Sequence, residues 1–282
     1  MNAHNLVSQT QSLISFPSVA IRVNELLADD DVSLNDVAAT IETDPALTAG
    51  LLRLSNSAAL GGTQEVNSVA KAITRIGLRQ INELVMGIDT ARSFNGLNNT
   101  LITVHDFWRH SLFCAVIARK LASLGKIKRR DAAFTAGLLH DIGQLLMFNQ
   151  LGKQCAECLS QSLDDNDGLV VHSIETEKLG FNHCDVGREL ATQWGLPKAL
   201  IDCIAHHHDP QNAEVDPGLV AAVHLANSLA VMAELDTCEE DNAPPTSDSA
   251  WDQLQLNRDI IPEMVLLAQE EVDELLAVFA GN

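Results

Sequence analysis

Apolar residues recur along most of the chain at spacings of three and four positions, which is the period of an α-helix that buries one face. No stretch shows the alternation of apolar and polar residues that is typical of a half-buried β-strand. Proline, glycine and short polar runs separate the periodic segments. The pattern therefore predicts an all-α protein.

Local signals set the bounds of several helices. Asp44 followed by Pro45 predicts a helix start, with an N-cap acid and a first-turn proline. Gly77 predicts a left-handed C-terminal cap for a helix that begins at Ser68. Further helices are expected over residues 18–28, 79–93, 101–124, 218–235 and 261–279.

The polar, turn-forming segment Asn95 to Asn99 is the candidate domain boundary. We expect an N-terminal helical bundle over residues 1–100, a helical core over 101–235, and an acidic linker with a C-terminal helix over 236–282. Nine of the ten histidines lie between residues 105 and 224, whereas the first hundred residues contain only His4. Any metal chemistry is therefore expected in the core segment.

Composition limits the range of partners. A chain of 282 residues that is 46% hydrophobic can bury a large core. Its formal net charge of −20 argues against binding to nucleic acid or to an anionic membrane. Residues 236–282 hold twelve acidic residues against the single base Arg258, so this segment is a candidate for recruiting a protein partner.

The cysteines and the N-terminus favour a cytoplasmic protein. Six cysteines are scattered through helical patterns, and no secretory signal precedes them, so reduced thiols are expected. Cys155 and Cys158 form a single CxxC, which suits small apolar positions on a helix better than a zinc ribbon. The most apolar stretch, Gly218 to Leu235, is interrupted by His224, Asn227 and Ser228 and therefore predicts a buried helix rather than a membrane span.

His140 and Asp141 lie side by side within the apolar run Leu138 to Leu146. A buried polar group without a partner costs about 1 to 3 kcal/mol, so this pair must bind a metal or be hydrogen-bonded. One nitrogen and one carboxylate suit Fe, Mn, Zn or Ni, and the carboxylate could bridge two ions. The alternative is a core histidine that orients a helix-capping aspartate.

Other candidate ligands are spread over several helices. Asp106 and His110 are four residues apart and share one helix face, either as a metal-capable pair or as a local surface contact. His206, His207 and His208 project about 100° apart on a helix, so the three cannot all enter one site. His183 begins a predicted helix, and Asn227 lies on the long apolar one.

The set resembles the HD superfamily of metal-dependent phosphohydrolases, whose ligand order of His, His-Asp, His, His-His and a final Asp matches most of these residues. The resemblance implies one or two divalent transition-metal ions. Asn227 stands where the final aspartate is expected, and this change removes an anionic ligand. The implied ligands are His110, His140, Asp141, His183, His207, His208 and Asn227, with Asp106 as an additional candidate.

A closer resemblance is to the HDOD proteins, the HD-related output domain of bacterial signalling. It implies a wholly helical fold, with an N-terminal bundle on an HD-like core, and a regulatory role. Gln144 replaces the lysine of the HD-GYP phosphodiesterases, and no GYP segment follows Asp209, so cyclic di-GMP is not expected as a substrate. The matching motifs are Asp44 to Leu47, Leu51 to Ala58, Ser68 to Gly77, Ala136 to Gly143, His183 to Gly187, Trp194 to Pro197, His207 to Pro210 and Val223 to Asn227.

Two hypotheses follow for the function. The favoured one is a signal-transduction protein that acts mainly by binding a signalling partner, with a structural or sensory metal. The alternative is a metal-dependent phosphohydrolase acting on a phosphoester such as a nucleotide. In that case His140 and Asp141 would be catalytic, and Arg109 or Arg188 would neutralise phosphoryl charge.

Overall fold

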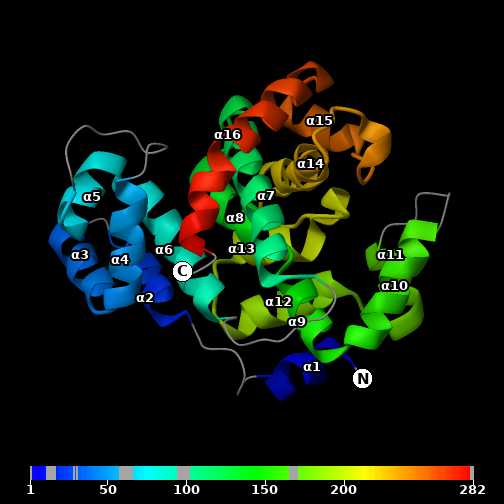
Figure 1. The fold of residues 1–282 in the computed structure, drawn as a ribbon, viewed down its shortest axis with the longest axis horizontal. Coiled ribbons are helices and arrows are strands. Elements are labelled where there is room, and N and C mark those ends of the chain that lie inside the picture. Colours follow the sequence, from blue (N-terminus) through cyan, green and yellow to red (C-terminus); the bar gives the residue numbers. More distant parts are fainter. Residues whose placement is uncertain are drawn as a thin grey trace. The chain divides into compact units, whose positions relative to one another are not determined.

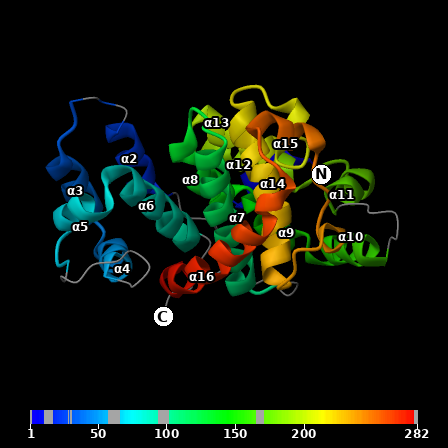
Figure 2. The ribbon, with the colours of Figure 1, turned by 90° about the horizontal axis from the view of Figure 1, so that it is seen from above.

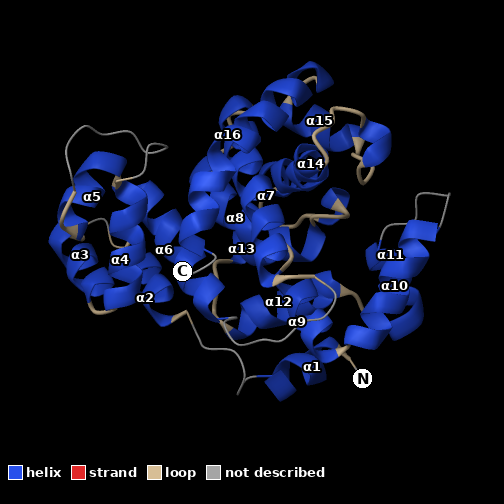
Figure 3. Cartoon of the chain, viewed as in Figure 1, coloured by secondary structure: helices blue, strands red, loops and turns tan. Residues whose placement is uncertain are grey.

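The computed structural model describes residues 2–10, 17–27, 29, 31–56, 66–93, 102–164 and 171–279. Every regular element in these ranges is helical, which confirms the all-α prediction (Figure 3). The predicted boundary Asn95 to Asn99, and Ser57 and Ala58 of the predicted N-terminal motif, lie outside the described residues. The α-helices are α1 Ala3–Thr10, α2 Ser18–Leu26, α3 Leu34–Glu42, α4 Pro45–Ser55, α5 Val69–Ile76, α6 Leu78–Ser93, α7 Val104–Leu124, α8 Ala133–Leu139, α9 Ile142–Gln150, α10 Gly152–Asp164, α11 Val171–Leu179, α12 His183–Gln193, α13 Lys198–His206, α14 Pro217–Glu234, α15 Asp248–Leu254 and α16 Ile261–Phe279.

The chain divides into two compact units. The larger unit comprises residues 1–13 and 96–270, and the smaller one comprises residues 14–95 and 271–282. The boundaries drawn from the sequence at residues 100 and 235 remain predictions.

In the smaller unit, α2 packs on α3 and α6, and α4 packs on α5 and α6. Its core contains Val23, Ile41 and Leu51, which are fully buried. The expected cap at Asp44 is present, since its Oδ1 accepts the N–H groups of the next helix turn at 2.9 and 3.0 Å. Gly77 ends α5 with a positive φ of 97°, which favours glycine, but its ψ of 145° lies outside the left-handed helical region, so the predicted left-handed cap is not formed.

The larger unit is organised around α7, which packs along α8 and α14 (Figures 1 and 2). By length and composition α14 alone among the described helices could cross a membrane, but 78% of its apolar window is buried inside the protein. It is therefore a core helix, as the polar residues within it predict. The N-terminal helix α1 packs against α12 in the same unit.

Two close helix contacts depend on glycine. A Cβ on Gly137 would lie 2.8 Å from the Ala115 Cα, so only glycine lets α8 approach α7 this closely. A Cβ on Gly143 would overlap the backbone of His183 and Gly187, where α9 crosses α12. Because these crossings lie on either side of residues 140 and 141, they hold the predicted dyad against α7 and α12.

Candidate metal centre

His140 and Asp141 form the junction between α8 and α9. His140 is completely buried, and its Nδ1 lies 2.6 Å from the carbonyl oxygen of Gly137. Asp141 occupies the N-cap position of α9, yet its side chain accepts no capping hydrogen bond. The capping alternative therefore does not describe this aspartate, and its carboxylate is directed elsewhere.

His183 is held at the start of α12 by two separate devices. Asn182 and Asp185 form a reciprocal capping box that fixes the first turn of the helix. The Oε2 of Glu175, a fully buried side chain on α11, accepts both the backbone N–H of His183 at 2.9 Å and its Nδ1–H at 2.7 Å. The imidazole is thereby fixed in one orientation.

His207 follows α13 and is anchored by its neighbours. Its Nδ1 lies 3.1 Å from the Ile204 carbonyl oxygen. The backbone N–H of Ser247 donates to His224 Nε2 at 2.9 Å, so the proton of His224 sits on Nδ1 and is donated to the carbonyl oxygen of His207 at 2.8 Å. His206 lies outside this group, and its Nε2 is 3.9 Å from Asp202 Oδ1. This agrees with the prediction that three consecutive histidines on a helix cannot all enter one site.

These hydrogen bonds define the tautomers. His140, His183 and His207 each direct Nδ1–H to an oxygen acceptor, so in the neutral, metal-binding form of each ring the lone pair lies on Nε2. The three Nε2 atoms converge on the Asp141 carboxylate. Its Oδ2 lies 3.1 Å from His140, and its Oδ1 lies 3.2 Å from His207 and 3.5 Å from His183.

The lone pair of an imidazole nitrogen and a carboxylate oxygen repel each other unless a cation or a proton lies between them. His140 Nε2 and Asp141 Oδ1 are buried and make no hydrogen bond of good geometry within the described part of the chain. Two donor atoms that are each about 2.1 Å from one ion lie about 3.0 Å apart at an octahedral right angle and about 3.4 Å apart at a tetrahedral angle. The observed separations of 3.1 to 3.5 Å suit a divalent metal ion.

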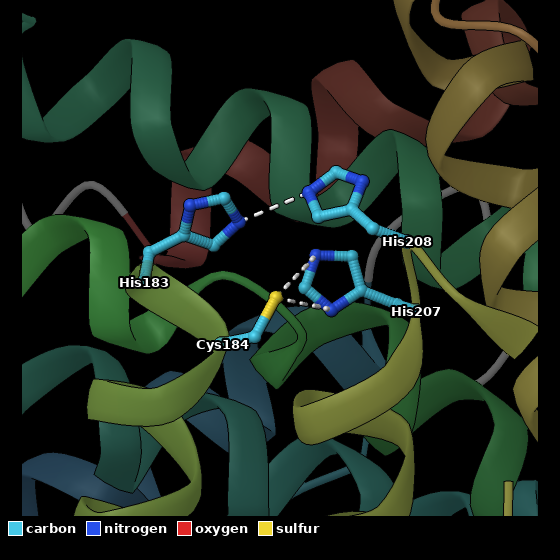
Figure 4. Close-up of side chains that lie close together, drawn as sticks. All are labelled: His183, Cys184, His207 and His208. Carbon is cyan, nitrogen blue, oxygen red and sulfur yellow. Dashed lines mark hydrogen bonds between the residues drawn. The ribbon is translucent and has the colours of Figure 1, made fainter. Parts of the chain in front are cut away.

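The potential ligands fall into two neighbouring groups. His110, His140 and Asp141 form one; His183, Cys184, His207 and His208 form the other, and within each group the ligand atoms lie within 4.8 Å of one another. Figure 4 shows the second group, in which the Nε2 atoms of His183 and His208 are 3.0 Å apart. Because the two oxygens of Asp141 face different groups, its carboxylate is placed to bridge two ions.

The structure brings the predicted pair His110 and Asn227 together. His110 Nε2 lies 3.0 Å from Asn227 Oδ1, and its Nδ1 lies 3.1 Å from Glu234 Oε2. Arg109 Nη1 is 3.9 Å from the other oxygen of Glu234. Asn227 therefore presents a neutral oxygen beside the candidate metal ligand, with a carboxylate on the far side of the imidazole.

The electrostatics of the cluster couple its members strongly. Burial alone would lower the pKa of His140, but the Asp141 charge holds that pKa well above its usual range. Burial alone would raise the pKa of Asp141, but His140 holds that pKa well below its usual range. Burial, and then the charge of His207, lower the pKa of His208. Protons and metal ions would compete for such a cluster.

Two candidates from the sequence are not brought into the cluster. Asp106 has 65% of its side chain exposed, and its carboxylate accepts a hydrogen bond from Thr103 Oγ at 2.6 Å. It is the third residue of α7, so its role is to complete the N-terminal cap of this helix. Arg188 pairs with Asp185 at 3.1 Å on the surface, whereas Arg109 lies beside Glu234.

The structure adds residues that the sequence analysis missed. Glu175 and Glu234 bind the Nδ1 atoms of His183 and His110, and the ring of His172 stacks on His208 with 4.2 Å between centroids. Glu234 could have been found, since it lies seven residues after Asn227 on α14 and therefore on the same helix face. Glu175 carries no such signal, because its burial depends on the packing of α11.

Comparisons with solved structures agree with this fold. An HDOD domain protein of unknown function from Geobacter sulfurreducens superposes with a TM-score of 0.78 at 23% identity, covering 96% of this chain and 97% of the other. A proposed phosphohydrolase from Shewanella amazonensis superposes with a TM-score of 0.76 at 23% identity, covering 97% of each chain. At these identities the likeness shows the fold alone.

Curated relatives are longer proteins. An uncharacterized protein of Treponema pallidum is 26% identical over 227 residues, which is 80% of this chain and 43% of that protein. A ribonuclease Y of Thermus thermophilus is 34% identical over 136 residues, which is 47% of this chain and 18% of the enzyme. The chain thus spans less than half the length of these relatives.

The HDOD domain pattern matches residues 13–210, a range that includes every member of the two ligand groups, from His110 to His208. Asn227 and Glu234 lie beyond the matched range. Since the match covers more than half of the sequence, the chain belongs to the HDOD domain family.

Proposed function

We propose that this chain is a signal-transduction protein whose HD-type centre holds one or two divalent transition-metal ions and which acts mainly by binding a signalling partner. The observation that carries the proposal is the distribution of the ligands. They come from α7, the α8–α9 junction, the start of α12, the end of α13 and α14. An ion held by these residues would cross-link five elements of the larger unit.

Such a cross-link couples metal occupancy to the packing of the helices. Metal binding to the folded state stabilises it by mass action, by about 2.7 kcal/mol at a concentration one hundred times the Kd. A change in metal supply would therefore change the stability of this unit. That is the property expected of a structural or sensory ion in a regulatory protein.

Asn227 favours regulation over hydrolysis. It offers His110 a neutral amide oxygen at 3.0 Å, where the HD pattern has an anionic ligand. A neutral oxygen offsets less of the charge of an ion than a carboxylate does, so an ion beside His110 would be held more weakly and would organise water less well.

A second candidate function is phosphoester hydrolysis, which the placement of Asp141 between both ligand groups favours. When bound, divalent ions polarise a phosphoryl oxygen and lower the pKa of water. Asp141, whose oxygens face both ligand groups, would help to hold the ions. Arg109, whose Nη1 lies 3.9 Å from Glu234 Oε1, would neutralise phosphoryl charge. Because one relative is named ribonuclease Y, phosphodiesters are the substrate class to test.

The variant Asn227→Asp separates the two functions. Because the substitution adds a negative charge next to His110, it should tighten the binding of Mn²⁺ or Fe²⁺ at least tenfold, or about 1.4 kcal/mol. Isothermal titration measures this affinity. In a regulator, neither the wild type nor the variant should hydrolyse a generic phosphodiester. Asn257→Asp adds the same charge at an exposed position and should leave the affinity unchanged.

Two results would contradict this account. Wild-type turnover of about 1 per second or faster, which is ordinary for an enzyme, would replace the regulatory proposal with the hydrolytic one. An unchanged or weaker affinity in Asn227→Asp would mean that Asn227 does not face the ion.

A further inference from the structure

Cys184 lies within the second ligand group but has no part in the HD pattern. It follows His183 in the first turn of α12, and its side chain is buried. Its Sγ lies 3.9 Å from Nδ1 and 4.0 Å from Nε2 of His207. In Figure 4 the sulfur points toward the His207 ring and into the group that His183 and His208 complete.

Buried cysteines often act only as small apolar side chains, so the surroundings of Cys184 decide its role. Cys203 on α13 is fully buried as well, and the described structure places it in no ligand group. Cys114 on α7 lies 4.0 Å from the Val223 carbonyl oxygen. Among the cysteines that the structure describes, only Cys184 has its sulfur within 4.8 Å of three imidazole ligand atoms.

A second observation points independently to a ligand at this place. Asp141 Oδ1 is buried and makes no hydrogen bond of good geometry within the described residues. It is directed at the same group, at 3.2 Å from His207 Nε2 and 3.5 Å from His183 Nε2. A carboxylate oxygen thus faces two of the imidazole nitrogens of the group to which Cys184 belongs, which is an arrangement that a cation satisfies.

We propose that Cys184 Sγ is a ligand of the ion held by His183 and His207, which makes this half of the centre a mixed nitrogen and sulfur site. The inference rests on the metal centre of the proposed function and specifies its chemistry. On binding, the thiol would release one proton to the solvent as the sulfur bonds to the metal. Thiolate is a soft ligand, so Zn²⁺ or Co²⁺ would be preferred over Mn²⁺ and Mg²⁺.

The distances agree with this assignment. With Zn–S of about 2.3 Å and Zn–N of about 2.0 to 2.1 Å, a tetrahedral ion separates sulfur and nitrogen ligands by about 3.5 Å. The 4.0 Å between Cys184 Sγ and His207 Nε2 exceeds this by an amount that a small side-chain rotation removes. The aliphatic part of the cysteine would stay in the core during that rotation.

The test is cobalt substitution of the whole chain after removal of metal by a chelator. One equivalent of Co²⁺ should produce a thiolate-to-cobalt charge-transfer band in the near ultraviolet. Cys184→Ala should abolish the band and reduce the preference for Zn²⁺ over Mn²⁺ at least tenfold. The matched variant Cys203→Ala, which removes a buried thiol outside the ligand groups, should keep both properties.

A measurement on the wild type does not depend on whether the variants fold. Zinc X-ray absorption should show a sulfur neighbour at about 2.3 Å. Cobalt or zinc bound in stoichiometric amount without sulfur features would overturn the role of Cys184 and leave the histidine centre intact. Failure to bind either metal would overturn this inference and the proposed metal centre together.

Discussion

The two compact units use buried carboxylates in different ways. In the smaller unit, Asp89 accepts the N–H groups of Val19 and Ala20 at 3.1 and 3.0 Å and so closes the start of α2. In the larger unit, Asp141 stands at the start of α9 but accepts no backbone N–H there. Its oxygens face three histidines instead.

The larger unit also contains a buried carboxylate that is bonded to the backbone. Asp202 on α13 is buried like Asp141, but it accepts the backbone N–H groups of Glu214, Val215 and Asp216 at 2.9 to 3.1 Å. Burial of a carboxylate therefore does not by itself indicate a ligand site. What distinguishes Asp141 is that, within the described residues, its carboxylate accepts no backbone N–H at the start of α9, so its charge is available to a cation.

The largest effect is expected from Gly143→Ala. A Cβ at this position would overlap the backbone of His183 and Gly187, so α12 would have to move away from Asp141. Overpacking of this kind costs typically about 1 to 3 kcal/mol, and the displacement of His183 should also abolish stoichiometric metal binding. Thermal unfolding and elemental analysis of the variant would measure both effects.

Gly152→Ala is the matched control, because a Cβ there would meet no other atom within 4 Å. It should leave the metal content unchanged. Full metal content in Gly143→Ala would show that the approach of α9 to α12 does not position the ligands, and would weaken the distinction drawn between the two units.

An intermediate effect is expected from Glu175→Gln. The substitution keeps the size of the side chain but removes the charge that holds Nδ1–H of His183, at 2.7 Å. Loss of such a partner typically weakens metal binding by about 10- to 100-fold. Titration with Zn²⁺ should show this loss, whereas Glu177→Gln, on the exposed side of the same helix, should bind as the wild type does. Equal zinc affinities in the two variants would show that Glu175 does not position His183 for metal binding.

The smallest effect is expected from Asp44→Asn in the smaller unit. Burial favours the neutral acid, but the N–H of Leu47 and the charge of Arg92, at 2.7 Å, together hold the pKa of Asp44 below its usual value of 3.8. A depressed pKa in the folded state contributes stability above about pH 4 that is lost as the pH falls through the folded value. Because the pair is partly exposed, the contribution is about 0.2 to 1 kcal/mol.

Urea unfolding between pH 2 and 7 measures this contribution. Asp44→Asn should lower the free energy of unfolding at pH 7 and make it fall less steeply below pH 4. Glu25→Gln removes a more exposed pair with Arg22 and should change neither quantity. A wild-type and variant difference that is independent of pH would show that the Asp44 charge does not stabilise the smaller unit.

Sequence reasoning reached the fold and many of the candidate ligands for identifiable reasons. Helical periodicity follows from which positions are buried, and the cap at Asp44 and the end of α5 at Gly77 depend on residues next to each other in the sequence. The predicted histidines were found because their order along the chain resembles a known pattern. The spacing of Asp106 and His110 fits both a ligand pair and a local surface contact, whereas the structure shows Asp106 exposed and hydrogen-bonded to Thr103 in the cap of α7.

The residues that orient the ligands could not be read from the sequence in the same way. Glu175 becomes a partner of His183 only because α11 packs beside the start of α12. Cys184 could be recognised as a neighbour of His183, but its distance from His207 depends on the packing of α12 against α13. Contacts between segments far apart in sequence leave no periodic signal.

The central claim is that the Asp141 carboxylate and the histidine nitrogens that face it bind a metal ion. Elemental analysis tests this claim most directly. Protein produced in metal-replete medium and purified without added metal should contain about one or two equivalents of a divalent transition metal. Asp141→Asn should lose that metal, while Asp202→Asn, which alters a carboxylate bonded to backbone N–H groups, should retain it. A wild type with far less than one equivalent, and with the same content as Asp141→Asn, would contradict the account.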